Sequence, residues 1–551
     1  MSEKFKLLFK LNYQSIIIFI GILLIVSSVI LSRPLNDLDE IWNYNFARNI
    51  ANGLIPYKDF NMLQTPLLPL IAGLLLKLFG NELIVMRALA ILLISALFFM
   101  VYKILKKLNV NIFYNLFCIL LLFLLLKNYI CIDYNFAILF LTLILIYLEL
   151  NSIIKNNINS KKCNNYFNNN LLFYFFIGFI CGCCILLKQS TGCIITIISI
   201  LYPILFIKNK IYFKNYLKTT VIKILGILIP IIFLMIYLIL NNAFFDFIDY
   251  TILGIKTFTN SIPYTNLIHS ENIYIKLMSI LIPIFILISG INLLIKKDKK
   301  LYGFYFYSIA SLIVIYPIAD NIHFLIGITP FFILFVYLLF NFFKYLLNNK
   351  FDGKLILKNK INNINLNKEN QLEKNNKYYK LNKNKNLILK IKLFLYELLK
   401  SLITLSLIIY IIFSTLILRD YLNNSEKKHT IEHYKNIPIS EELINKINEI
   451  DNYILSQNTS VYILDAESAI YMISIDRYNK DFDMFLKGNL GSMGEIGQIE
   501  KIKNLEIGTK ILIRNKKYNL NWQTPMEVIF YIRNNLNKIG EISIFDIYEI
   551  N

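Results

Sequence analysis

The sequence predicts an all-α polytopic membrane protein with a small α/β domain at its C-terminal end. The 551 residues are 56% hydrophobic with a mean hydropathy of +0.54, which is far too apolar for a soluble protein of this size. Several apolar runs also exceed about 18 residues, the length that an α-helix needs to cross roughly 30 Å of hydrocarbon. We therefore expect about 11 transmembrane helices and additional juxtamembrane helices.

The first apolar run, residues 14–31, sets the orientation of the chain. It follows the basic segment MSEKFKLLFK, and positive charge beside a span marks the cytoplasmic side. The run is too long for a removable signal peptide and has no small-residue cleavage site after it. We predict a multi-pass protein of the cell membrane with a cytoplasmic N-terminus.

The second apolar piece, residues 66–79, decides the topology of everything that follows. It contains two prolines and one lysine and is shorter than a spanning helix. If this piece does not cross, every later Lys-rich loop faces the cytoplasm, as the positive-inside rule requires. We therefore predict a juxtamembrane helix here. The other spans are predicted at about 83–102, 112–128, 134–150, two that meet at 188–192, 221–241, 274–295, two that meet at 318–324, and about 401–418.

This topology divides the chain into four parts. Residues 1–346 form a transmembrane core. Residues 347–389 contain ten Lys and three acidic residues, which predicts a disordered cytoplasmic loop. Residues 390–418 hold the last transmembrane helix, and residues 419–551 form an extracytoplasmic α/β domain.

Three segments of the tail indicate the α/β domain. SVYILDA (460–466) and GTKILIRN (508–515) have the apolar runs of buried strands. TPMEVIFYIRNNL (524–536) has the period of an amphipathic helix, with Pro525 in its first turn. The sequence of the tail contains no phosphate-binding loop and no catalytic triad.

Charge and cysteine content exclude two kinds of site. The net charge of +21 comes from Lys residues in short loops between spans, a pattern of membrane topology that argues against a nucleic-acid partner. All seven Cys lie at or before residue 193. CGCC (181–184) lies inside an apolar span and lacks the paired CxxC spacing of structural zinc, so we predict small packing residues there.

Three carboxylates follow the first span in NDLDEIW, residues 36–42. Asp37 and Glu40 have the spacing of a capping box, which would open a helix through about residue 52. Capping leaves Asp39 without a role. Because three carboxylates are costly to hold close together at a membrane surface, a functional role is the second interpretation.

Other ionisable groups fall at the same outer ends of the predicted spans. Such groups at membrane depth are expensive and are usually functional. Because separate outer segments contribute them, we predict one site at the outer face. Its members are Asp37, Asp39, Glu40, Asp59, Asp133, Lys188, Asp320 and His323.

A series of motifs in chain order adds a resemblance to a known family. NDLDEIW is followed by NGLIPYKDFNMLQTPLLPLI (52–71), and then by LFGNELIVMRALA, IDYNF, LKQSTG and YPIADNIHFLIGITP. In this order the chain resembles the GT-C superfamily of polyprenyl-phosphate-sugar-dependent glycosyltransferases, near the protein O-mannosyltransferases and the lipid A aminoarabinose transferase. The resemblance covers roughly residues 10–345, and the Asp-Glu pair of the first outer loop is its most specific part.

The resemblance implies a reaction and its requirements. A sugar would move from a polyprenyl-phosphate donor in the membrane to a cell-envelope glycan, a lipid or a protein, in one displacement that inverts the anomeric carbon. This chemistry needs a general base for the acceptor hydroxyl and positive charge or a metal ion for the leaving phosphate. It also needs an apolar slot among the membrane lipids for the polyprenyl chain.

The resemblance further implies roles in the first two outer loops. Asp39 takes the position of the catalytic base. Glu40 is a neighbour that can exchange roles with it, since adjacent carboxylates repel and one becomes the better base. Asp59 matches an acidic position that helps to bind a metal ion or the acceptor. Asp133 matches the acid of the second loop, with helix capping as its alternative role.

The remaining charged candidates suit the donor. Lys188 and Arg87 lie near outer helix ends and can hold a lipid phosphate, although Arg87 equally suits a headgroup anchor. Asp320 and His323 share one face of a helix start. They fit either a contact with phosphate or sugar, or a plain structural pair.

Three questions stay open at the level of sequence. Trp42 and Tyr57 can stack on a sugar, but aromatic side chains also line membrane interfaces. A metal site at Asp39, Asp59 and Asp133 would suit Mg²⁺ or Mn²⁺ better than Zn²⁺, because no Cys or paired His joins the carboxylates. The rival function is transport or flipping of a lipid-linked sugar, although transporters place charged sites near the bilayer midplane, often in repeated halves.

Overall fold

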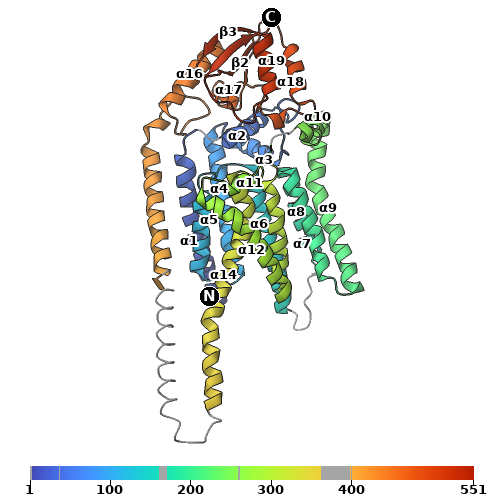
Figure 1. The fold of residues 1–551 in the computed structure, drawn as a ribbon, viewed down its shortest axis with the longest axis vertical. Coiled ribbons are helices and arrows are strands. Elements are labelled where there is room, and N and C mark those ends of the chain that lie inside the picture. The colour runs from blue at the N-terminus through green and yellow to red at the C-terminus, as the bar shows by residue number, and fades with distance from the viewer. Residues whose placement is uncertain (1–2, 36–37, 160–169, 258–260, 362–396, 399) are drawn as a thin grey trace.

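Apolar helices packed along one another make up the larger part of the molecule, and a small α/β domain covers one end of them (Figure 1). We call this the domain end of the bundle. The computed structural model describes all residues except 1–2, 36–37, 160–169, 258–260, 362–396 and 399. Helices and a small C-terminal sheet are the elements of the predicted fold class, which is confirmed.

The helices of the bundle follow one another along the chain. In chain order they are α1 (Glu3–Ser32), α2 (Leu38–Ala51), α3 (Leu67–Phe79), α4 (Leu83–Lys107), α5 (Ile112–Leu126), α6 (Tyr134–Asn159), α7 (Leu171–Leu187), α8 (Gln189–Leu201), α9 (Lys210–Leu240), α10 (Phe244–Thr251), α11 (Thr265–Ile268), α12 (Ile273–Lys296), α13 (Tyr302–Ser311) and α14 (Asn321–Ile361). Short 3₁₀ segments lie between some of them: η1 (Tyr202–Phe206), η2 (Leu253–Thr257), η3 (Lys299–Leu301) and η4 (Leu312–Ile315).

Eight helices in the described part of the chain are long and apolar enough to cross a membrane, and the protein is a multi-pass membrane protein. The last of them, Lys400–Asn423, ends five residues beyond the predicted span. Three further predicted spans correspond to helices that are shorter than these eight. They are α5 with 15 residues, α7 with 17 residues, and α13 continued by η4.

The short helix α3 corresponds to the predicted juxtamembrane piece. Its 13 residues make a helix of about 20 Å, which is too short to cross the hydrocarbon layer. It packs against α2 near the domain end (Figure 1). The helix α14 continues to Ile361 and so includes the start of the predicted loop 347–389. Residues 362–396 lie outside the described residues, so the disorder of that loop stays a prediction.

Close packing of α7 on α9 explains the CGCC segment. A Cβ atom at Gly178 would lie 2.0 Å from the carbonyl oxygen of Lys223, and one at Gly182 would lie 2.6 Å from that of Ile227. Small residues allow such backbone contact between membrane helices. Cys181 and Cys184 are buried in the bundle, and the predicted packing role of this segment is confirmed.

The C-terminal domain is a four-stranded sheet with helices around it. The strands β1 (Val461–Leu464), β2 (Lys510–Arg514), β3 (Asn537–Ile542) and β4 (Phe545–Glu549) lie in the order β1-β2-β4-β3, with β1 and β2 parallel. The helices are α16 (Glu441–Ser456), α17 (Ser468–Ser474), α18 (Gly494–Lys503) and α19 (Met526–Asn535). The two predicted strands and the predicted helix are present, and Pro525 occupies the N-cap position of α19, one residue before the first turn in which it was predicted. The terminal hairpin of β3 and β4 was not predicted.

Candidate active site

Asp39 and Glu40 form the first turn of α2, whereas Asp37, the predicted cap of this helix and a predicted member of the site, lies outside the described residues. Asp39 is half-buried. Glu40 is buried and accepts two hydrogen bonds from Arg87 on α4, with Nε–Oε1 and Nη2–Oε2 distances of 3.0 and 2.9 Å. Arg87 is fully buried and also donates to the carbonyl oxygen of Arg33 at 2.6 Å. This bidentate ion pair holds the start of α2 on α4. The guanidinium of Arg87 therefore has its partners, Glu40 and the backbone of Arg33, inside the protein.

A second group of polar side chains lies where α6 begins and where α7 meets α8. Asp133 is buried and accepts a hydrogen bond from the backbone N–H of Asn135 at 2.9 Å. Lys188 is the single residue between α7 and α8, and its Nζ donates to Oδ1 of Asn135 at 2.9 Å. The same Nζ lies 5.5 Å from the ring centroid of Tyr134. Asn135 therefore connects the acid of one loop with the lysine of another.

The start of α14 completes the group. The Nδ1 atom of His323 lies 2.8 Å from Oδ1 of Asp320, which also caps the helix through the backbone N–H of His323. The charges of Asp133 and Asp320 act on Lys188, and the charge of His323 acts on Asp133. The hydroxyl of Tyr134 lies within the influence of all three carboxylates, including Asp39. We call this set the carboxylate–lysine cluster: Asp39, Asp133, Tyr134, Asn135, Lys188, Asp320 and His323.

Burial shapes the electrostatics of the cluster. Burial raises the pKa of Asp133, and the positive charges of His323 and Lys188 oppose this shift. Burial likewise lowers the pKa of Lys188 to about 8, against the attraction of Asp133 and Asp320. The lysine is therefore charged in the free protein below about pH 8, and it is surrounded by carboxylates that favour this state.

Four helices begin at the cluster: α2, α6, α8 and α14. A helix N-terminus carries partial positive charge and unpaired N–H groups, which favour an anion. Asp133 and Asp320 cap α6 and α14, but Lys188, the N-cap residue of α8, makes no capping hydrogen bond with its side chain. In the first turn of α8 the hydroxyl of Thr191 is buried and has no hydrogen-bond partner among the described residues. Lys188 and this turn together can receive a phosphate group.

Gly192 makes the sharp reversal at Lys188 possible. A Cβ atom at this position would lie 2.3 Å from the carbonyl oxygen of Cys184, so α8 starts in backbone contact with α7. We expect Gly192→Ala to separate the two helices and to destabilise the protein by about 1–3 kcal/mol. A thermal-shift measurement with Gly21→Ala in α1 as the control tests this, because a Cβ atom at Gly21 meets nothing within 4 Å. Equal melting temperatures for the two variants would contradict it.

Three of the sequence candidates have structural roles away from the cluster. Asp59 accepts a hydrogen bond from the N–H of Ile55 at 2.7 Å and closes a turn near the end of α9. Tyr57 is buried, and its hydroxyl donates to the carbonyl oxygen of Gln64 at 2.8 Å. Trp42 donates its indole N–H to the carbonyl oxygen of Ala466 in the C-terminal domain at 2.9 Å.

The proposed metal ligands do not come together. Among the described residues, no group of three or more His, Cys, Asp or Glu side chains is placed to hold a metal ion. Asp59 lies in its own turn, apart from Asp39 and Asp133 in the cluster. The residues present therefore do not fit the metal site considered from the sequence, and we derive no chemical step through a metal ion.

Sequence reasoning assigned no role to Tyr134, Asn135 and Thr191. All three lie inside quoted motifs, IDYNF and LKQSTG, so their positions were within reach. They were missed because the candidates near the ends of spans were selected by charge, and these three side chains are neutral. The pairing of Asn135 with Lys188 joins residues 53 positions apart, and only the packed helices show it.

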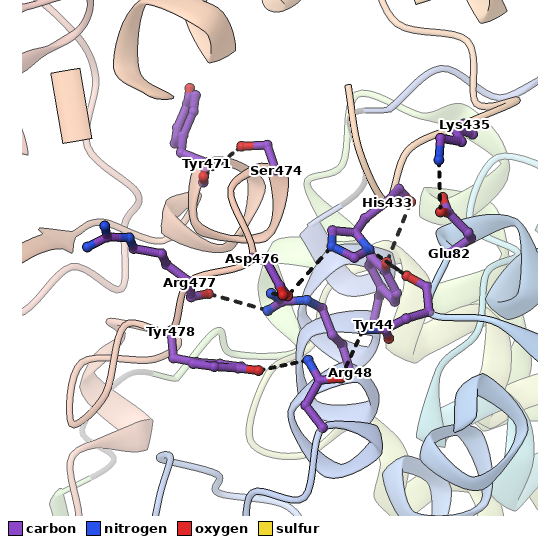
Figure 2. A network of polar contacts seen from close by, with 12 residues as sticks. Tyr44, Arg48, Glu82, His433, Lys435, Tyr471, Ser474, Asp476, Arg477 and Tyr478 are labelled. Atoms are coloured by element: carbon purple, nitrogen blue, oxygen red, sulfur yellow. Dashed lines mark hydrogen bonds and ion pairs between the residues drawn. The ribbon is translucent and has the colours of Figure 1, made fainter. Parts of the chain in front are cut away.

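The C-terminal domain is fixed to α2 by polar contacts. The guanidinium of fully buried Arg48 pairs with Asp476 and donates to the carbonyl oxygen of Arg477 at 3.3 Å (Figure 2). Nearer the start of α2, Asn45 donates to Oδ1 of Asp483 at 3.1 Å. The helix that carries Asp39 is therefore held between α4 on one side and the C-terminal domain on the other.

Contacts around the start of α4 extend this attachment. The backbone N–H of Leu83 donates to the carbonyl oxygen of His433 at 2.9 Å, and Lys435 lies 3.7 Å from Glu82. The Nδ1 atom of His433 lies 2.8 Å from the carbonyl oxygen of Asn81. The segment 433–435 thus ties the C-terminal domain to the same helix that binds Glu40.

Comparison with known proteins establishes the fold. No protein-family model matches the chain, and no curated protein matches its sequence. Among solved structures, the chain is similar to ArnT from Cupriavidus metallidurans bound to undecaprenyl phosphate, with a TM-score of 0.54, 11% identity and 97% of both chains covered. The apo state of the same protein gives a TM-score of 0.52 at 11% identity over 98% of both chains.

A third structure is more distant. The archaeal oligosaccharyltransferase AglB from Archaeoglobus fulgidus, in complex with an inhibitory peptide and a dolichol-phosphate, gives a TM-score of 0.44 at 12% identity. It covers 91% of this chain and 69% of its own. The likeness to ArnT along nearly the whole chain shows that the protein has the GT-C fold, as predicted.

Proposed function

We propose that the protein transfers a sugar from a polyprenyl-phosphate donor to an acceptor hydroxyl at the domain end of the membrane. The observation that carries the proposal is the carboxylate–lysine cluster, in which Tyr134 connects the two groups: the charge of Asp39 on α2 acts on Tyr134, and the Nζ atom of Lys188 at the start of α8 lies 5.5 Å from the ring centroid of the same tyrosine. ArnT, which shares the fold, binds undecaprenyl phosphate, and this supports a polyprenyl-phosphate donor. By the positive-inside rule, the domain end is the outer face.

Asp39 is the proposed general base. Its carboxylate takes the proton from the acceptor hydroxyl while the acceptor oxygen bonds to the anomeric carbon of the sugar. The bond between that carbon and the phosphate oxygen breaks on the opposite side, and the configuration inverts. Glu40 supports this step through its pair with Arg87, which holds the start of α2 in place.

Lys188 and the first turn of α8 are the proposed site of the leaving phosphate. As the bond to the sugar breaks, the phosphate oxygen takes the electron pair and gains negative charge. A lysine cation, free N–H groups and the hydroxyl of Thr191 stabilise that charge. Asn135 and Asp133 hold Lys188 in position, and Asp320 fixes the ring of His323 beside Asp133.

The proposed acceptor is a cell-envelope glycan, a lipid or a protein. The polyprenyl chain remains among the apolar helices throughout, so the donor reaches the cluster from within the membrane. No nucleic acid takes part, since the basic residues follow membrane topology.

The function can be tested in cells that carry wild-type protein or the Asp39→Asn variant at equal abundance. We expect the variant to accumulate one polyprenyl-phosphate sugar in lipid extracts, measured by mass spectrometry, and to lose one sugar from the envelope glycans. Asp298→Asn is the matched control, because Asp298 pairs with Lys300 in a loop between α12 and α13. Unchanged lipids and glycans in folded Asp39→Asn would contradict the proposal.

A further inference from the structure

A groove lies between the end of α1 and the end of the last helix, Lys400–Asn423. Its volume is about 330 Å³. The residues that line it are Ser32, Ile417, Asp420, Tyr421, Asn423 and Asn424. None of these side chains belongs to the carboxylate–lysine cluster, so the groove is a feature that the proposed transfer reaction does not use.

The groove opens between two helices that face lipid. Only 11% of the apolar stretch of the last helix and 28% of that of α1 are buried inside the protein. The last helix stands at the edge of the bundle (Figure 1). Its exposed apolar side chains are Leu402, Leu405, Ile408, Ile412, Phe413 and Leu416. Acyl chains therefore cover this face, and the groove at the ends of both helices lies at the level of lipid headgroups.

The lining favours a cation with hydrogen-bond donors. The carboxylate of Asp420 is exposed and has no hydrogen-bond or ion-pair partner within the described part of the chain. α1 and the last helix both end at the groove, and a helix C-terminus carries partial negative charge. Asn423 adds an amide to the lining. A protonated amine fits these groups better than a carboxylate or a bare hydrocarbon.

A positive group lies beside the same groove. The Nζ atom of Lys427 is 4.1 Å from the ring centroid of Tyr421, which is a lining residue. It also donates to the carbonyl oxygen of Leu422 at 3.3 Å. A ligand that carries an amine and a phosphate a few bonds apart would meet Asp420 with the first and Lys427 with the second.

We propose that this groove binds the headgroup of a membrane phospholipid with a primary amine, of the phosphatidylethanolamine class. The ammonium group donates hydrogen bonds to Asp420, the phosphate faces Lys427, and the acyl chains lie along the exposed faces of α1 and the last helix. Such a lipid fills the space beside the last helix and joins it to the bundle. The inference does not depend on the proposed transferase activity.

The test is native mass spectrometry of the full-length protein. The protein is mixed in mild detergent with equal amounts of phosphatidylethanolamine, phosphatidylcholine and phosphatidylglycerol of the same acyl composition. We expect wild-type protein to retain phosphatidylethanolamine in preference, since phosphatidylcholine lacks the N–H donors and phosphatidylglycerol lacks the positive charge. In Asp420→Asn we expect the preference for phosphatidylethanolamine to fall about tenfold, because a hydrogen bond to a charged group is removed.

Two further variants make the result specific. Asp420→Glu keeps the charge and should retain the preference, and Asp298→Asn removes a carboxylate elsewhere and should behave as wild-type. Because Asp420 is exposed, its substitution leaves the fold intact. The proposal is overturned if Asp420→Asn retains phosphatidylethanolamine as wild-type does, or if wild-type protein shows no preference among the three lipids.

Discussion

Replacing Lys188 with methionine is expected to lower kcat/KM for the polyprenyl-phosphate donor by about 100- to 1000-fold. Methionine keeps the length and much of the apolar stem but removes the positive charge at the start of α8. The leaving phosphate then loses its main electrostatic partner as the bond to the sugar breaks. The measurement is the rate of donor consumption by purified protein, followed by mass spectrometry of the lipids.

The control and the pH dependence separate this role from a structural one. Lys58→Met removes an exposed lysine whose Nζ donates to the carbonyl oxygen of Asn241, and it should leave kcat/KM unchanged. In the wild type, binding of polyprenyl phosphate should weaken as the pH rises through about 8, because Lys188 loses its proton there. In Lys188→Met this step should disappear. A pH profile that Lys188→Met leaves unchanged would exclude the lysine as the phosphate contact.

Replacing Lys223 with methionine is expected to destabilise the bundle by about 3–5 kcal/mol. Lys223 of α9 is buried, lies 3.8 Å from Glu149 of α6, and donates to the carbonyl oxygen of Ser199 at 2.7 Å. The Nζ atom of Lys223 also lies 5.8 Å from the ring centroid of Tyr174 and 5.9 Å from that of Tyr202. Removal of the lysine takes away the cation that lies 3.8 Å from the buried carboxylate of Glu149.

Thermal unfolding of the purified protein measures this effect. The double variant Glu149→Met with Lys223→Met removes both charges and should recover most of the lost stability, since an apolar pair of similar size is often as stable as a buried ion pair. Lys218→Met removes an exposed lysine from the same helix and should change the melting temperature little. A double variant as unstable as the single one would mean that packing, and not charge, makes Lys223 important.

Several features of the fold were within reach of the sequence because the bilayer constrains them. Apolar length and the placement of Lys residues predicted where helices would cross and that 66–79 would lie at the surface. The same topology predicted that Asp39, Asp133, Lys188 and Asp320 would share one end. The structure brings these four together with His323.

Contacts between residues that are far apart in the sequence could not be predicted from it. Glu40 and Arg87 are 47 positions apart, and their pairing depends on how α2 lies across α4. Trp42 and Ala466 are 424 positions apart, and nothing in the pattern around Trp42 indicates a contact with the C-terminal domain. Arg87 as a phosphate contact and Trp42 as a sugar-stacking residue were predicted from their positions near the outer ends of predicted helices. The contacts of both side chains, however, are set by tertiary packing.

We propose that the carboxylate–lysine cluster transfers a sugar, with Asp39 as the base. The most direct measurement adds purified protein to lipid extracts from cells that carry Asp39→Asn, in which the donor accumulates. Wild-type protein should consume one polyprenyl-phosphate sugar and release polyprenyl phosphate in equal amount, and Asp39→Asn should do so about 100- to 10,000-fold more slowly. No release by folded wild-type protein in the presence of envelope acceptors, or equal rates for the two proteins, would contradict the account.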